Sequence, residues 1–152
     1  MGLFNFAAHI GKKLFGDDDK EETASAKLQK EIENNNPGVE NLKVKVENGV
    51  ATIKGDAKSP EALEKAILMA GNTMGIKEVK AQEATVAGQT EVKLGSDDEF
   101  YVIQKGDSLW KIAEHAYGNG GKYHTIFEAN REVIQDPDKI FPGQKIRIPK
   151  QS

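Results

Sequence analysis

Apolar and polar residues alternate most regularly in the first half of the chain. Leu42–Val46 places apolar side chains at every second position, and Val50–Ile53 follows as a second segment rich in β-branched residues; this pattern is typical of half-buried strands. Asn48-Gly49 separates the two segments, and Asn-Gly favours the type I′ turn that joins paired strands. The pattern therefore predicts a β-hairpin that closes at Gly55-Asp56.

Helical spacing of apolar residues precedes this hairpin. Thr23–Asn34 predicts a helix with Ala26, Leu28 and Ile32 on its inner face. The following residues, up to Pro37-Gly38, include turn-formers and a proline that end a helix.

A second helix is predicted directly after the hairpin. Ser59 is suited to cap it, and Pro60 is suited to its first turn, where a missing N–H costs nothing. The turn Gly71–Gly75 then leads into a last strand from Ile76 to about Val86. The buried face of this helix is predicted to contain Leu63, Ala66, Ile67 and Ala70.

The N-terminus also has helical spacing. We expect a short amphipathic helix that packs on the domain that follows, and the alternative is a helix lying on a membrane surface. The membrane alternative is weaker because the polar face carries few basic residues. Gly16 and the acidic run Asp17–Asp19 end this helix. Its apolar stripe consists of Leu3, Phe4, Phe6, Ala7, Ile10, Leu14 and Phe15.

The second half of the chain predicts a compact strand–helix–helix–strand unit. Tyr101–Ala113 reads as a strand, a tight turn at Gly106 and the start of a helix capped by Asp107 or Ser108. A second helix is predicted over about 123–130, and Ile140–Pro149 supplies a turn and the returning strand.

Length and composition fit two small globular domains. The chain has 152 residues, a net charge of −3 and no cysteine, which excludes disulfides and thiolate metal sites and gives no strong attraction to nucleic acid. No stretch approaches the roughly 18 apolar residues needed to span a bilayer. The N-terminal segment lacks the basic start and long apolar run of a secretory signal. We therefore expect a cytoplasmic monomer that neither inserts stably into membranes nor binds nucleic acid.

Catalytic motifs are not apparent. His9, His115 and His124 are scattered and have no metal-ligand spacing, and the acidic run at residues 17–19 lacks the pattern of a calcium loop. Ser108 has no general base in its sequence context. The sequence favours a binding protein over an enzyme.

Both halves resemble known families. Asn48–Gly55 and the turn-strand Gly71–Val79 resemble the BON domain, and Tyr101–Pro149 resembles LysM throughout. The resemblance implies an α+β protein of two small domains: a BON-like αββαβ domain preceded by the N-terminal amphipathic helix, then a βααβ LysM domain. The expected boundaries are 1–22 for the helix, 23–87 for the BON-like domain, 88–98 for a linker and 99–150 for LysM.

LysM modules bind glycans that contain N-acetylglucosamine, including peptidoglycan, between two loops. The residues at the groove positions are equally explained as turn and helix-cap residues. Glycan binding by an envelope protein is therefore kept as the alternative function. Carried onto this chain, the groove would consist of Gly106, Asp107, Ser108, Leu109, Asp138, Lys139, Ile140 and Phe141.

The whole combination, beginning Met1-Gly2-Leu3-Phe4, resembles the small cytoplasmic BON–LysM potassium-binding proteins. It implies a K⁺ sensor or buffer that changes conformation on binding the ion. Proteins hold K⁺ with carbonyl oxygens, and helix C-termini offer carbonyls without intrahelical partners. From the residues around Gly71 alone, an ordinary helix that ends at a glycine is about as good an interpretation as an ion site. By resemblance, the ligands would be the backbone carbonyls of Ala7, Ile10, Gly71, Thr73 and Ile76.

Overall fold

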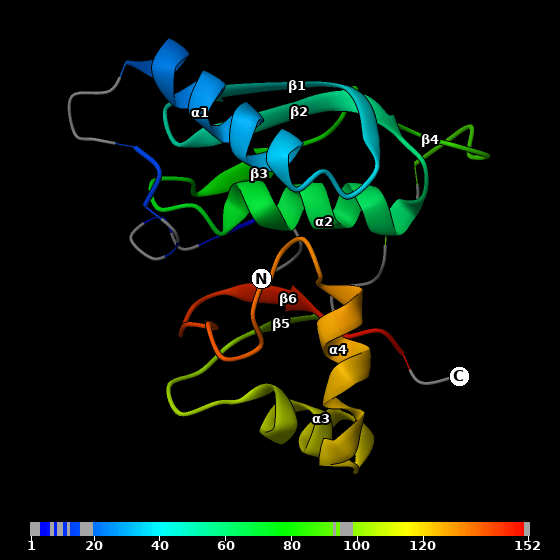
Figure 1. The fold of residues 1–152 in the computed structure, drawn as a ribbon. Coiled ribbons are helices and arrows are strands. Elements are labelled where there is room, and N and C mark those ends of the chain that lie inside the picture. The colour runs from blue at the N-terminus through cyan, green and yellow to red at the C-terminus, as the bar shows by residue number, and fades with distance from the viewer. Residues whose placement is uncertain are drawn as a thin grey trace.

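The computed structural model describes residues 4–6, 8, 11, 13–15, 20–92, 94 and 99–150, which form two α+β units (Figure 1). The first unit consists of α1 Glu21–Asn34, β1 Val39–Glu47, β2 Val50–Ala57, α2 Pro60–Gly71, β3 Glu78–Lys80 and β4 Thr85–Val86. The second consists of β5 Phe100–Val102, α3 Leu109–Tyr117, the short 3₁₀ helix η2 Gly120–Lys122, α4 Tyr123–Ala129 and β6 Lys145–Arg147. The predicted αββαβ and βααβ orders are thus confirmed, with the last strand of the first unit divided in two.

The β1–β2 hairpin forms as the alternation predicts. Asn48 and Gly49 have φ angles of 52° and 77°, the positive values that a type I′ turn requires at both central positions. Buried and exposed residues alternate along β1, so only one face of the sheet is covered. Both α1 and α2 lie on that face (Figure 1).

The prediction of one continuous strand from Ile76 to about Val86 is wrong. Two short strands, β3 and β4, pair in parallel with β2 at different points along its length. The chain turns between them, where the Ala84 N–H donates to the Ala81 carbonyl at 3.2 Å. This turn breaks the strand because it takes the backbone away from the β2 edge.

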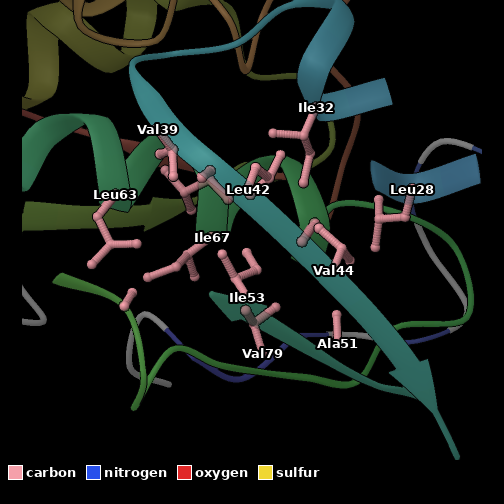
Figure 2. Packing of buried hydrophobic residues seen from close by; sticks show 14 of the residues in the cluster. Leu28, Ile32, Val39, Leu42, Val44, Ala51, Ile53, Leu63, Ile67 and Val79 are labelled. Carbon is pink, nitrogen blue, oxygen red and sulfur yellow. The ribbon is translucent and has the colours of Figure 1, made fainter. Parts of the chain in front are cut away.

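The core of the first domain lies between the sheet and its two helices. Ser59 caps α2 as predicted, since its side chain accepts a hydrogen bond from Ala62 N–H at 3.1 Å. All four predicted inner residues of α2 are buried, but Ala26 of α1 is exposed and Ala24 is buried in its place. Figure 2 shows side chains of both helices and three strands converging: Leu28, Ile32, Val44, Ile53, Leu63, Ile67 and Val79.

The prediction of an N-terminal amphipathic helix is wrong for the described residues among 4–15, because none of them is helical. Asn5 forms an antiparallel bridge with Glu78, the Phe6 N–H donates to the Lys77 carbonyl at 2.9 Å, and the Val79 N–H donates to the Phe4 carbonyl at 2.9 Å. Residues 4–6 pair with this region because the free edge of β3 offers them backbone partners. The predicted packing on the domain is confirmed for three of its members, Phe6, Leu14 and Phe15.

The second domain has its own small core between its helices and its two-stranded sheet. Strands β5 and β6 are antiparallel, with Tyr101 opposite Ile146. Of the two residues suggested as the cap of α3, Ser108 serves, and its side chain accepts from Lys111 N–H at 3.1 Å. Within the described part of the chain, no helix is long and apolar enough to cross a membrane.

Candidate functional site

The turn that follows α2 is the best candidate for a functional site. Gly71 is the last residue of α2, and the Thr73 carbonyl accepts from Ile76 N–H at 3.1 Å. Gly75 has a φ angle of 102°, a value that L side chains rarely adopt. Gly71, Thr73 and Ile76 are all buried, so this turn places several main-chain carbonyls in a protected position at the negative end of a helix.

The N-terminal segment lies directly against this turn. The Gly75 N–H donates to the Ala8 carbonyl at 2.6 Å. Gly11 comes so close to the turn that a Cβ built on it would lie 2.3 Å from the Asn72 carbonyl oxygen. Ala7 and Ile10, the other two predicted ligands, lie outside the described residues, but Ala8 and Gly11 beside them both contact the turn.

Phe6 fixes the approach of the segment at a second point. Its ring is buried and packs on Gly71, where an added Cβ would lie 2.1 to 2.3 Å from three ring atoms. A glycine is therefore needed at position 71 for this contact. Main-chain carbonyl oxygens of Ala8, Asn72 and Thr73 are among the groups at this contact, and carbonyl oxygens are suited to holding a weakly charged cation. Among the residues that the structure describes, no three His, Cys, Asp or Glu side chains are grouped to hold a metal ion.

The turn also contacts the second domain. The Asn72 side chain is buried, and its Nδ2 donates to the Lys145 carbonyl at 2.7 Å while its Oδ1 accepts from Lys145 N–H at 2.8 Å. Lys145 is itself buried, and its Nζ lies 4.4 Å from the centroid of the Phe6 ring and donates to the Asn5 carbonyl. Three separate parts of the chain therefore meet at Lys145.

Two ion pairs extend this junction along α2. Glu64 Oε1 lies 2.8 Å from Arg147 Nε, and both side chains are largely buried at 5% and 13% exposure. Lys65 pairs with Glu132 at 2.8 Å. The Arg147 guanidinium also donates to the Ala129 carbonyl at 3.0 Å. These contacts fix α2 against β6 and the segment after α4.

A cavity of about 330 Å³ lies beside the turn, between the domains. Met69, Asn72 and Thr73 line it from the first domain, and Glu132 and Phe141 are among its residues from the second. The candidate ion turn thus borders both the domain junction and an adjacent hollow.

The two loops predicted to bind glycan lie at the same end of the β5–β6 sheet. The first follows β5 and the second precedes β6, and the Gly143 N–H donates to the Ile103 carbonyl at 2.7 Å between them. Lys139 and Phe141 of the second loop also line the cavity between the domains. The second loop is therefore shared between the groove and the junction.

Several of the predicted groove residues serve the fold. Asp107 Oδ2 accepts from the Tyr101 hydroxyl at 2.5 Å and from Gln104 N–H at 2.8 Å. Burial and this hydrogen bond raise the pKa of Tyr101 to about 12. Gly106 has a φ angle of 89°, Ser108 caps α3, and Leu109 is buried. In the second loop, Asp138 and Lys139 donate their N–H groups to Asp136, and Ile140 packs on the core.

The histidines are not grouped into a site where they are described. His115 and His124 are exposed on α3 and α4, and the centroid of the His124 ring lies 3.9 Å from that of the Tyr123 ring. His9 and the acidic run at 17–19 lie outside the described residues.

The sequence matches two domain families. Residues 20–88 match the BON domain, and residues 101–149 match the LysM domain. Across its length the chain is similar to "Potassium binding protein Kbp" of Escherichia coli O6:H1 (strain CFT073). The identity is 38% over 156 aligned residues, which cover 99% of this chain and 100% of that relative. The chain belongs to the Kbp family.

Other relatives share only part of this organisation. An uncharacterized protein of Deinococcus radiodurans is 38% identical over 102 residues, which cover 64% of this chain and 40% of that protein. The spore coat assembly protein ExsA of Bacillus cereus is 39% identical over 54 residues, which cover 36% of this chain and 8% of that protein. Membership of the Kbp family, together with the BON and LysM domains, points to a binding protein.

Sequence reasoning missed the residues that join the domains. Asn72 was included only as part of a turn, and Glu64, Lys145 and Arg147 have ordinary surface residue types. One signal in the sequence could have pointed to Lys145 and Arg147. They flank Ile146 in the last strand of a small domain, and the outer edge of such a strand needs hydrogen-bond partners. Which partners they find depends on the other domain.

Proposed function

We propose that the protein binds K⁺ as a cytoplasmic sensor or buffer, without enzymatic activity. The ligands would be the backbone carbonyls of Ala7, Ile10, Gly71, Thr73 and Ile76. The observation that carries this proposal is the docking of the N-terminal segment on the Gly71–Ile76 turn, through Gly75 N–H to the Ala8 carbonyl and through Phe6 on Gly71. Full-length similarity to a potassium binding protein supports the choice of ion.

The chemistry of the turn suits this ion. K⁺ is large and singly charged, and carbonyl dipoles can replace its water shell, whereas Ca²⁺ and Mg²⁺ favour carboxylates. The end of α2 contributes carbonyls that the helix leaves without i+4 partners and a negative dipole. Glycines at positions 71 and 75 let the backbone turn tightly and let Phe6 approach.

Ion binding would also change conformation by shifting populations. The proposed ligands come from two segments, the N-terminal segment and the turn, so an ion that binds both stabilises the state in which they are docked. Because the turn contacts Lys145, that state includes the docked LysM domain. We expect a monomer in both states.

K⁺ should stabilise the protein more than Na⁺ does. Binding at 100 times the dissociation constant adds about 2.7 kcal/mol to the free energy of unfolding, which raises the melting temperature of a chain of this size by roughly 5–10 °C. Thermal melts in KCl and NaCl at equal ionic strength, with isothermal calorimetry, measure this difference. Equal melting temperatures and equal heats in the two salts would contradict the proposal.

Glycan binding through LysM is the second candidate, favoured by the placement of both predicted loops at one end of the β5–β6 sheet. Sedimentation with insoluble peptidoglycan tests it. We expect little retention, because the second loop contributes Lys139 and Phe141 to the junction cavity. Strong retention that free N-acetylglucosamine oligomers compete away would establish glycan binding instead.

A further inference from the structure

Strand β6 has different partners on its two edges. The backbone groups of the even-numbered residues in and next to β6 face β5. The Ile103 N–H donates to the Gln144 carbonyl at 2.8 Å, and the Ile148 N–H donates to the Glu99 carbonyl at 2.6 Å. The N–H and C=O groups of the odd residues, Lys145 and Arg147, point to the opposite edge, as the alternation of a strand requires. No strand pairs with that edge within the described residues.

Two asparagine side chains take the place of the missing strand. Asn130 of the LysM domain donates to the Arg147 carbonyl at 2.8 Å and accepts from Arg147 N–H at 2.8 Å. Asn72 of the first domain makes the same pair of bonds with Lys145, at 2.7 and 2.8 Å. One half of the edge is therefore completed within LysM, and the other half only when the two domains are docked.

The Asn72 bonds make docking specific. Both partners are buried in the junction, and a buried N–H or C=O group without a partner costs free energy comparable to a lost hydrogen bond. A small rotation of the turn would break both bonds together, because they leave one planar amide. Docking of LysM therefore depends on the orientation of the backbone at position 72.

That same backbone carries the proposed ion ligands. Asn72 lies between Gly71 and Thr73, and its own carbonyl oxygen faces Gly11. The peptide plane before its Cα carries the Gly71 carbonyl, and the plane after the Cα of Thr73 carries the Thr73 carbonyl, so two of the proposed ligands lie on either side of Asn72 along the backbone. An ion that fixes these planes also fixes the direction of the Asn72 side chain.

We propose that Asn72 is the positioning residue that transmits ion occupancy to the LysM domain, by completing the free edge of β6 at Lys145. This inference rests on the proposed K⁺ binding at the turn. Lys145 reinforces the connection, because its Nζ donates to the Asn5 carbonyl and lies over the Phe6 ring. The contacts of Asn72 and Lys145 then connect the proposed ion site to the LysM domain.

The test uses full-length Asn72→Ala and the backbone amide of Arg147 as a reporter. This amide bonds to Asn130, so it keeps its own partner in the variant. In the wild type, K⁺ should slow its hydrogen exchange at least about tenfold relative to Na⁺, a change within the usual range of coupling between sites. In Asn72→Ala, the K⁺ effect on this exchange should fall below about twofold, and K⁺ affinity by calorimetry should weaken by about tenfold, the loss expected when coupling is removed.

Lys65→Met is the matched control, because it removes another contact between the same domains, the Lys65–Glu132 pair, away from the turn. It should keep the K⁺ response of the Arg147 amide. Asn72→Asp is the second variant: it can still accept from Lys145 N–H but cannot donate to the Lys145 carbonyl. It should lose most of the LysM response and still bind K⁺, with an affinity weakened no more than in Asn72→Ala, because coupling between two sites is reciprocal.

The outcomes separate the two proposals. A wild-type protein without a K⁺-specific heat would overturn the proposed function. A wild type that binds K⁺, with an Arg147 response of full size in Asn72→Ala, would overturn the role of Asn72 alone. Complete loss of K⁺ binding in a folded Asn72→Asp would also overturn it, because Asn72 would then be part of the ion site and not a connection from it.

Discussion

Gly71→Ala should separate the N-terminal segment from the turn and remove the K⁺-specific rise in melting temperature. A Cβ at position 71 would lie 2.1 to 2.3 Å from three atoms of the buried Phe6 ring. Neither group can move freely, because Gly71 ends α2 and Phe6 is bonded to Lys77. Overpacking of this kind costs about 1–3 kcal/mol, which exceeds the gain of about 1 kcal/mol from alanine's helix propensity.

The substitution should also weaken ion binding. Displacing Phe6 also displaces Ala7 and the residues that follow, which carry two of the proposed ligands. We expect K⁺ affinity to fall by more than about tenfold, which corresponds to losing about 1.4 kcal/mol of binding free energy. Calorimetry with KCl, together with melts in KCl and NaCl, measures both effects.

The double variant with Phe6→Ala provides the control. Without the ring, alanine at position 71 no longer meets an obstacle, so adding Gly71→Ala to Phe6→Ala should be neutral or slightly stabilising. The interaction between the two substitutions is then measured by a double-mutant cycle. An equal loss of stability from Gly71→Ala in both backgrounds would show that the clash is not its cause.

Glu64→Ala should strongly destabilise the docked arrangement of the two domains. The substitution leaves the Arg147 guanidinium at 13% exposure without the carboxylate 2.8 Å away. Removing one partner of a largely buried ion pair costs about 3–5 kcal/mol. The remaining bond from Arg147 to the Ala129 carbonyl does not neutralise the charge. Urea unfolding should show a lower midpoint, with the LysM domain unfolding separately from the first domain.

Glu128→Ala is the matched comparison. Glu128 pairs with Arg131 at the same distance, 2.8 Å, but both side chains are exposed, at 60% and 58%. Solvent screens such a pair, so its loss should leave the urea midpoint almost unchanged. Glu64→Gln, which keeps the shape and an acceptor, should fall between the two. Equal midpoints for Glu64→Ala and Glu128→Ala would contradict the importance of burial at this junction.

Sequence patterns predicted most of the local structure because local forces determine it. The Asn48-Gly49 turn, the Ser59 and Ser108 caps and the buried face of α2 all depend on neighbouring residues. The turn at Gly71–Ile76 was found for the same reason. Its use as an ion site stays a prediction, since backbone ligands have no side-chain signature.

The N-terminal segment shows where local patterns misled. Its apolar spacing suits a helix, yet the Phe4 carbonyl accepts from Val79 N–H of β3, and the Phe6 N–H donates to the carbonyl of Lys77, directly before β3. A short isolated helix is marginal in water, whereas the free edge of β3 offers ready partners. A pattern of side chains does not reveal that such an edge exists, because the edge forms from residues more than 70 positions away.

The LysM fold was evident from the sequence itself, since its turn, caps and strand pattern are all local. How LysM is connected to the rest of the protein was decided only by the tertiary structure. The bonds from Asn72 to Lys145 and from Glu64 to Arg147 join residues 73 and 83 positions apart. Their stabilising effect comes from burial at the junction, and burial exists only after both domains have folded and docked.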